Sequence, residues 1–179
     1  MTARPAVLAA CLALAACGER VVADLPAPAY TMQEVTYAAS ERDLRVVIHG
    51  TPFGGDPQAF GREVTDMMQN RIMGVRTNFT TTPGPSARPD YRVVLAFNLA
   101  QNELNSALCS RPDFPTKPPG GSMVVQAAFC RGGGALTSAT GWLNKPISTQ
   151  DPEFRDLISD LTFSLFPTPR AEACAGLRC

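Results

Sequence analysis

The chain has 179 residues, and its 16 Lys and Arg residues balance its 16 Asp and Glu residues, so the formal net charge is zero. This balance gives no electrostatic reason to expect a nucleic-acid partner, because nucleic-acid-binding domains concentrate positive charge. The 16 prolines and 14 glycines favour turns and loops over a helical bundle. The length suits a single domain with one core.

The N-terminus has the pattern of an export signal. One cation, Arg4, precedes an uninterrupted run of small and apolar residues from Ala6 to Ala16. This run is too short for a membrane-spanning helix, which needs about 20 apolar residues. Small side chains at Ala15 and Ala16 suit the groove of a signal peptidase, and Cys17 follows directly.

The sequence Leu14-Ala15-Ala16-Cys17 resembles the lipobox of bacterial lipoproteins. The resemblance implies cleavage between Ala16 and Cys17, a diacylglyceryl group on the Cys17 thiol and a further acyl chain on its amino group. Two or more chains anchor a protein stably in a lipid bilayer. In this family an aspartate after the cysteine favours the inner membrane. Gly18 at that position therefore favours the periplasmic face of the outer membrane.

A second candidate cysteine has the same four-residue context, in Leu8-Ala9-Ala10-Cys11. Cleavage before Cys11 would leave a very short apolar segment and would keep residues 12–16 in the mature protein. The sequence after Cys17 becomes polar, as expected after a processing site. We therefore expect lipidation at Cys17.

The sequence of the first part of the mature chain predicts a tether followed by two strands. Residues 17–31 contain two prolines and show no helical period, which predicts a flexible tether. Residues 32–40 predict an edge strand, although their apolar residues do not alternate cleanly. Residues 44–49 are dense in β-branched side chains and precede Gly50, which predicts a core strand.

Two Asp-Pro pairs, Asp56-Pro57 and Asp151-Pro152, predict the starts of two helices. Aspartate caps free N–H groups, and proline suits the first helical position. Apolar residues follow each pair at helical spacing. In the first helix, which Gly74 would end, they are Phe60, Val64, Met67, Met68 and Ile72. In the second they are Phe154, Leu157, Ile158, Leu161 and Leu165.

The middle of the chain predicts further strands and one long loop. Residues 75–82 form an extended, Thr-rich run, and residues 91–99 carry apolar side chains at every odd position. Residues 101–121 predict an irregular loop with one helical turn near its start. Residues 122–131 and 135–143 predict a hairpin that turns through three glycines.

This order of elements predicts an α+β two-layer sandwich. A mostly antiparallel sheet of four to six strands would have two helices on one face. We expect a signal peptide at residues 1–16, the lipidated tether at 17–31, a single periplasmic domain at 32–169, and a tail at 170–179.

Four cysteines lie beyond the signal and anchor, Cys109, Cys130, Cys174 and Cys179. An even number in an oxidising periplasm predicts two disulfides, for which three connectivities are possible. We favour Cys109 with Cys130 and Cys174 with Cys179, because each pair joins near neighbours across a loop. A zinc site has little support in a chain with one histidine and no Cys-x-x-Cys pair, and we expect no metal and no cofactor.

The segment from Val46 to Pro52 contains His49-Gly50 and resembles the strand and turn that help to build the oxyanion hole of α/β-hydrolases. The chain has no Gly-x-Ser-x-Gly motif, and His49 is its one histidine. We therefore expect a non-enzymatic binding or accessory protein of the cell envelope, involved in assembly, transport or secretion with an envelope protein partner. The alternatives are a small hydrolase that uses His49 with an acidic residue, and a structural envelope protein.

Overall fold

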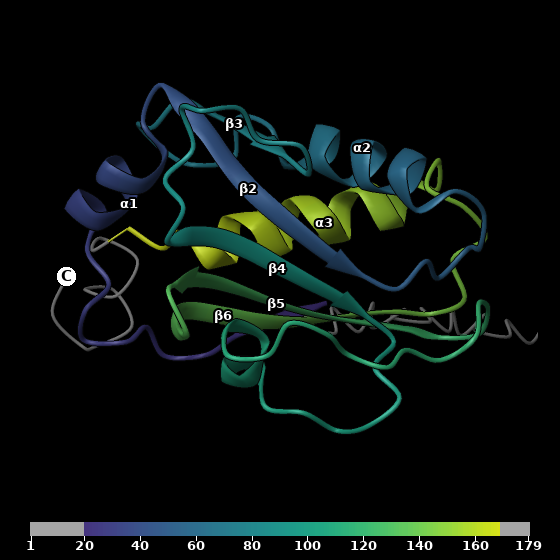
Figure 1. Ribbon diagram of the computed structural model, residues 1–179. Coiled ribbons are helices and arrows are strands. Elements are labelled where there is room, and N and C mark those ends of the chain that lie inside the picture. The colour runs from purple at the N-terminus through teal and green to yellow at the C-terminus, as the bar shows by residue number, and fades with distance from the viewer. Residues whose placement is uncertain (1–19, 169–179) are drawn as a thin grey trace, which may run out of the picture.

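The computed structural model describes residues 20–168, which form six strands, three α-helices and one 3-10 helix (Figure 1). Their order is β1 (Val21–Ala23), α1 (Met32–Ala39), β2 (Arg42–His49), α2 (Pro57–Met68), β3 (Thr77–Thr80), β4 (Tyr91–Phe97), η1 (Asn105–Cys109), β5 (Met123–Arg131), β6 (Gly134–Leu143) and α3 (Pro152–Leu165).

The six strands form one open sheet in the order β1-β6-β5-β4-β2-β3. The three pairs from β1 to β4 are antiparallel, whereas β2 pairs in parallel with both β4 and β3. The predicted hairpin is present, and Gly132 adopts a positive φ of 57° in its turn. The predicted α+β fold with a mostly antiparallel sheet is thus confirmed.

All three helices pack against one face of the sheet, and β2 crosses in front of α3 in Figure 1. The odd positions of β4 point into this main core, as the alternation predicted. The Asp56 carboxylate accepts hydrogen bonds from the N–H groups of Gln58 and Ala59, and Asp151 caps α3 in the same way through Glu153. These caps satisfy N–H groups that the first helical turn leaves without partners.

The opposite face of the sheet is partly covered by the long loop that follows β4. This loop contains η1 and holds a second, smaller apolar cluster against β4 and β5, formed by Val94, Ala96, Leu99, Leu108, Cys109, Phe114, Ala128 and Cys130. The predicted disulfide between Cys109 and Cys130 is present, with the two Cα atoms 5.5 Å apart. Cys174 and Cys179 lie outside the described residues.

Residues 32–40 are the clearest difference from the prediction, because they form helix α1 where an edge strand was expected. The Thr31 hydroxyl caps this helix by accepting a hydrogen bond from the Glu34 N–H group at 3.1 Å. Val35, Ala38 and Ala39 follow at helical spacing and are fully buried. Two of these three residues are alanines, which are only weakly hydrophobic. The helical spacing is therefore hard to detect in the sequence, although all three side chains are buried in the structure.

The expected tether at residues 17–31 is also corrected, because its described part belongs to the folded domain and the sheet already begins at Val21. Strand β1 pairs with the edge of β6, with Val21 opposite Gly141. The Tyr30 hydroxyl donates a hydrogen bond to the Pro167 carbonyl at 2.9 Å and so joins this segment to the end of α3. From residues 20 to 168, no helix is both long and apolar enough to cross a membrane.

Helix α1 is joined to the sheet by Glu34, whose carboxylate accepts a hydrogen bond from the Tyr91 hydroxyl and contacts Arg131 Nη1 at 2.6 Å. The hydrogen bond from Tyr91, and then that from Arg131, hold the pKa of Glu34 below its ordinary value. A carboxyl whose pKa is lowered by folding stabilises the folded state above its unfolded pKa. This contribution is lost as the pH falls through the folded-state value.

We expect Glu34→Gln to lower the free energy of unfolding at pH 7 by about 1 kcal/mol, because the replaced hydrogen bonds are charge-assisted but partly exposed. The difference from the wild type should shrink below about pH 4.5, the unfolded value of the carboxyl, as the wild-type carboxyl becomes protonated. Urea unfolding at several pH values measures this. Asp66→Asn, on the exposed side of α2, is the control and should change stability little. A constant Glu34→Gln difference from pH 7 to pH 3 would contradict the linkage.

Candidate functional site

The candidate site lies along β2, which extends past the end of its neighbour β3. Strand β3 pairs with β2 only from Arg42 to Arg45. The following segment, Val46–His49, pairs with β4 on one side. On its other side it has no partner strand within residues 20–168. The backbone of Val46–His49 therefore forms a short, open sheet edge next to α2.

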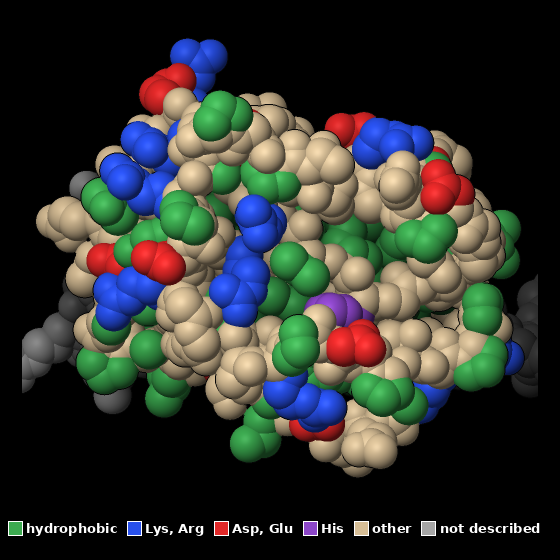
Figure 2. All heavy atoms as spheres, in the orientation of Figure 1, with side chains coloured by type: hydrophobic (Ala, Val, Ile, Leu, Met, Phe, Trp, Pro, Cys, Tyr) green, Lys and Arg blue, Asp and Glu red, His purple; other side chains and the backbone are tan. Residues whose placement is uncertain are grey.

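A groove of about 760 Å³ follows this open edge, which we call the β2 groove. Helix α2 forms its other wall, and the turn after β3 closes one end. Its lining residues are Arg45, Val46, Val47, Ile48, Gly50, Thr51, Pro57, Gln58, Phe60, Gly61, Arg62, Thr81, Thr82, Pro83 and Thr116. Figure 2 shows the hollow above His49, with hydrophobic side chains inside it. Its size lies within the range that is usual for ligand pockets.

The charged residues of the β2 groove are all positive. Arg45 on β2 and Arg62 on α2 line it, and the described residues that line it include no Asp or Glu. Both arginines are exposed. Neither guanidinium makes a hydrogen bond or an ion pair with any other residue of the described chain, so both are available to bind an anionic group.

The wall of the groove depends on a glycine in the middle of α2. A Cβ atom at Gly61 would lie 3.1 Å from Thr81 Cγ2 and 3.9 Å from Ile48 Cδ1. Glycine is unfavourable inside a helix, by about 1 kcal/mol relative to alanine. Here it lets α2 lie close to the turn after β3 without a side chain filling the space between them.

His49 ends β2, and its surroundings explain it as a packing residue. Its ring lies edge-on to Phe114 with 5.3 Å between the centroids, and its Nδ1 is 3.9 Å from an Asp113 carboxylate oxygen. Burial lowers the pKa of His49, and Asp113 opposes this shift only in part. Within residues 20–168, no Ser, Thr or Cys side chain is hydrogen-bonded to His49. The structure thus places an acidic residue beside His49, but at a distance longer than a hydrogen bond.

The His49-Gly50 pair has a backbone explanation of its own. Gly50 adopts a φ of 86°, and a Cβ atom there would lie 2.8 Å from the Phe97 carbonyl oxygen. Only glycine fits such a close approach of two strand ends without strain. The sequence that resembles a hydrolase turn is therefore the turn in which β2 leaves the sheet.

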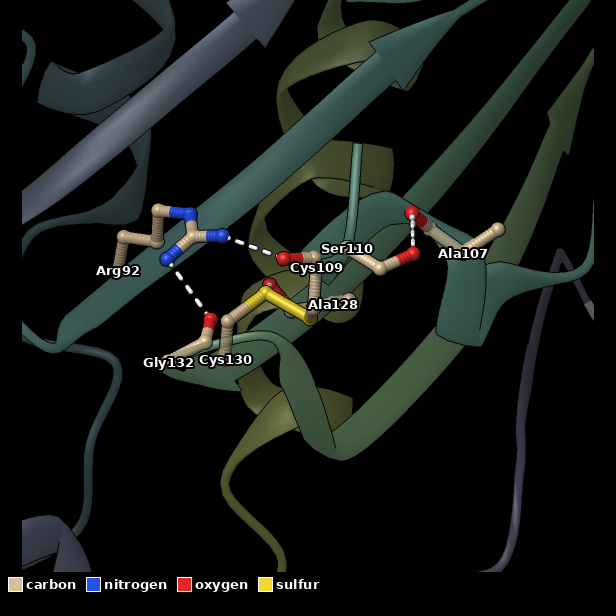
Figure 3. Close-up of a disulfide and its surroundings, with 7 residues drawn as sticks. All are labelled: Arg92, Ala107, Cys109, Ser110, Ala128, Cys130 and Gly132. Atoms are coloured by element: carbon tan, nitrogen blue, oxygen red, sulfur yellow. Dashed lines mark hydrogen bonds between the residues drawn. A yellow bond between two sulfur atoms is a disulfide. The ribbon is translucent and has the colours of Figure 1, made fainter. Parts of the chain in front are cut away.

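The two cysteines that the sequence predicted as partners lie on the face of the sheet opposite the helices, in the second apolar cluster, and neither lines the groove. Figure 3 shows Arg92 beside their disulfide, donating hydrogen bonds to the carbonyls of Cys109 at 2.5 Å and Gly132 at 3.0 Å. This arginine connects β4 to both the long loop and the hairpin turn. Cys17 and Ala16, the predicted lipidation and cleavage residues, lie outside the described part of the chain.

Sequence reasoning did not find the β2 groove or its two arginines. The only available signal was that the extended run at residues 75–82 is followed at once by Pro83-Gly84-Pro85, which limits how far β3 can accompany β2. The described residues contain no group of three or more His, Cys, Asp or Glu side chains that could hold a metal ion.

No family model matches the chain, and no curated protein sequence does. Among solved structures, the chain is similar to the PelC dodecamer from Paraburkholderia phytofirmans, with 14% identity and a TM-score of 0.43, over 82% of this chain and 96% of that one. A methionine-substituted form of the same dodecamer gives 14% identity and a TM-score of 0.42, over 82% of this chain and 97% of that one. A likeness this distant carries no argument about function.

Proposed function

We propose that this protein is a lipoprotein, anchored through Cys17 to the periplasmic face of the outer membrane, which binds an envelope protein at the β2 groove without catalysing a reaction. The observation that carries the binding function is the groove itself. It combines an open strand edge, an apolar floor and two arginines that have no side-chain partner among residues 20–168. These features recognise a ligand but supply no nucleophile with a base beside it.

The structure also supports an anchor close to the domain. Strand β1 begins at Val21, and four extended residues reach at most about 14 Å. Lipidation at Cys17 would therefore hold this end of the sheet next to the bilayer. The backbone N–H group of Trp142 donates a hydrogen bond to the Arg20 carbonyl at 2.9 Å, and Trp142 is 44% exposed. Tryptophan is favoured at membrane interfaces, because its ring is amphipathic.

The order of the strands separates the anchor from the groove. Strand β1 is one edge of the sheet, and β2 is the fifth strand from that edge. At the usual spacing of strands the two are about 19 Å apart. An anchored β1 would leave the β2 groove on the side of the domain that is open to a periplasmic partner.

The anchor is tested by metabolic labelling of intact cells with a fatty-acid analogue. We expect the Cys11→Ser variant to incorporate the label and the Cys17→Ser variant to lose it, because only Cys17 would carry the acyl chains. Label that persists in Cys17→Ser and disappears in Cys11→Ser would move the lipidation site to Cys11. Absence of label from the wild-type protein would contradict the anchor altogether.

The binding function is tested by placing a photo-crosslinking amino acid in intact cells. Position 58 lines the groove on α2, and position 66 lies on the same helix outside the groove. We expect one reproducible partner protein to crosslink from position 58 and not from position 66. Equal crosslinking from both positions, or none from position 58, would contradict a binding site in the groove.

A further inference from the structure

We propose that the β2 groove binds an extended peptide segment that carries acidic side chains and adds to the sheet as a short strand beside β2. This inference rests on the proposed binding function and names the chemistry of the partner. The segment would occupy the place that β3 leaves open and would pair with Val46–His49.

The backbone of β2 has hydrogen-bonding groups that face the groove. In a strand, the N–H and C=O groups of alternate residues point to opposite neighbours. Within Val46–His49, one set bonds to β4, so the other set faces the groove. No strand of the described chain receives these groups. An added strand would pair with them, as in other complexes in which a peptide extends a sheet.

The side chains along the open edge point alternately to the two faces of the sheet. Val46 and Ile48 point towards the helices, where Phe60 and the bare backbone of Gly61 continue the apolar surface. Arg45 and Val47 point to the opposite face. A peptide strand next to β2 would therefore place alternate side chains in an apolar recess and beside a guanidinium.

The positive charge of the groove favours an acidic ligand. A carboxylate suits Arg45 and Arg62, because a guanidinium can donate two parallel hydrogen bonds to it. Arg92 is the cross-strand neighbour of Arg45 on β4 and adds positive charge on that face. The chain as a whole is neutral, so this preference is local to the groove. Acidic residues at alternate positions of the peptide fit this arrangement.

A second copy of the chain could also pair with an open sheet edge, but this edge is too short to favour such pairing. Beyond the end of β3 the open segment covers only Val46–His49, and the turn at Thr81–Pro83 closes one end. A short edge of this kind disfavours pairing between two whole sheets. It leaves room for a single peptide strand.

The test uses the purified protein and a fluorescent heptapeptide of alternating valine and threonine with two glutamates. Two control peptides are made, one with both glutamates replaced by glutamine and one with a central proline, which cannot pair as a strand. We expect the glutamate peptide to bind at least about 10-fold more tightly than either control, because each control removes one of the two modes of recognition.

Protein variants locate the binding. We expect Arg62→Glu and Arg45→Glu each to weaken binding of the glutamate peptide by at least about 10-fold, because reversing a contact charge adds repulsion. Arg155→Glu, on the exposed side of α3 and outside the groove, should leave it unchanged. Circular dichroism of each variant confirms that the exposed substitutions preserve the fold. Backbone amide NMR shifts on binding should be largest at Val46–His49.

Several results would overturn the proposal. These are no binding of the glutamate peptide, equal binding of the three peptides, or unchanged binding by Arg62→Glu and Arg45→Glu. Concentration-dependent dimers that Arg62→Glu abolishes would assign the groove to a second copy instead. If crosslinking from position 58 still captures a partner when the peptide does not bind, the binding function stands and strand addition is wrong. If neither crosslinking from position 58 nor peptide binding is observed, the binding function and strand addition are both wrong.

Discussion

Replacing Phe154 by alanine is expected to lower the free energy of unfolding by about 3–5 kcal/mol. Phe154 is fully buried on α3, and its ring centroid lies 5.2 Å from that of Phe53 and 6.3 Å from those of Phe60 and Phe97. Truncation would remove its apolar contacts and leave a cavity that these rings cannot fill without moving. Urea unfolding followed by circular dichroism measures the loss.

The matched control is Phe163→Ala, on the same helix, where the side chain is 54% exposed. This variant should change the free energy of unfolding by no more than about 0.5 kcal/mol. Domains of this size have total stabilities of about 5–15 kcal/mol, so Phe154→Ala can approach complete unfolding. Phe154→Leu keeps most of the buried volume and should give a smaller, measurable loss. Equal effects of Phe154→Ala and Phe163→Ala would contradict the described core.

The position of Phe154 also connects the core to the candidate site. Phe60 lies between the core and the groove. Its ring centroid is 5.1 Å from that of Phe97, and its side chain forms part of the floor of the β2 groove. Three aromatic side chains from α2, α3 and β4 therefore fix the distance between α2 and the sheet. The width of the groove follows from core packing, although the residues that would contact a ligand lie on the surface.

Much of the fold could be predicted from the sequence, because its signals are local. The Asp-Pro starts of α2 and α3, the alternation along β4 and the three-glycine turn each depend on residues that are neighbours in the chain. Helix α1 was missed because its buried face is largely alanine, and short helices depend on tertiary packing more than on propensity. Strand β1 was missed because an edge strand of three residues has no period to detect.

The candidate site could not be predicted for a different reason. The β2 groove exists because β3 is four residues long and β2 is eight, and because these two strands are neighbours in the sheet. The lengths of the two strands could be predicted only approximately from the sequence. Their adjacency in the sheet is a property of the folded topology. Arg45 and Arg62 belong to different elements, and no sequence motif links them. His49, by contrast, stood out in the sequence and has a structural explanation in the fold.

Removing the Cys109–Cys130 disulfide with the double substitution Cys109→Ala and Cys130→Ala is expected to lower the free energy of unfolding by about 3 kcal/mol. The bond joins residues separated by 21 positions, and the cost follows from the extra freedom that the unfolded chain gains. At about 2–4 °C per kcal/mol for a domain of this size, Tm should fall by about 6–12 °C. Alanine is chosen because both cysteines are buried in an apolar cluster.

The folded state should survive this change, because other contacts hold the long loop in place. Arg92 still donates its hydrogen bonds to the carbonyls of Cys109 and Gly132, and Leu108 and Phe114 stay in the second apolar cluster. Thermal unfolding followed by circular dichroism measures Tm, and amide hydrogen exchange should speed up most at Asn105–Cys109, where the loop loses its covalent link to β5. Ser110→Ala, next to the disulfide in the same loop, is the control and removes only an exposed hydrogen bond to Ala107. A double variant that melts within about 1 °C of the wild type would show that the unfolded chain gains little freedom when the bond is removed, since the predicted fall is several times larger.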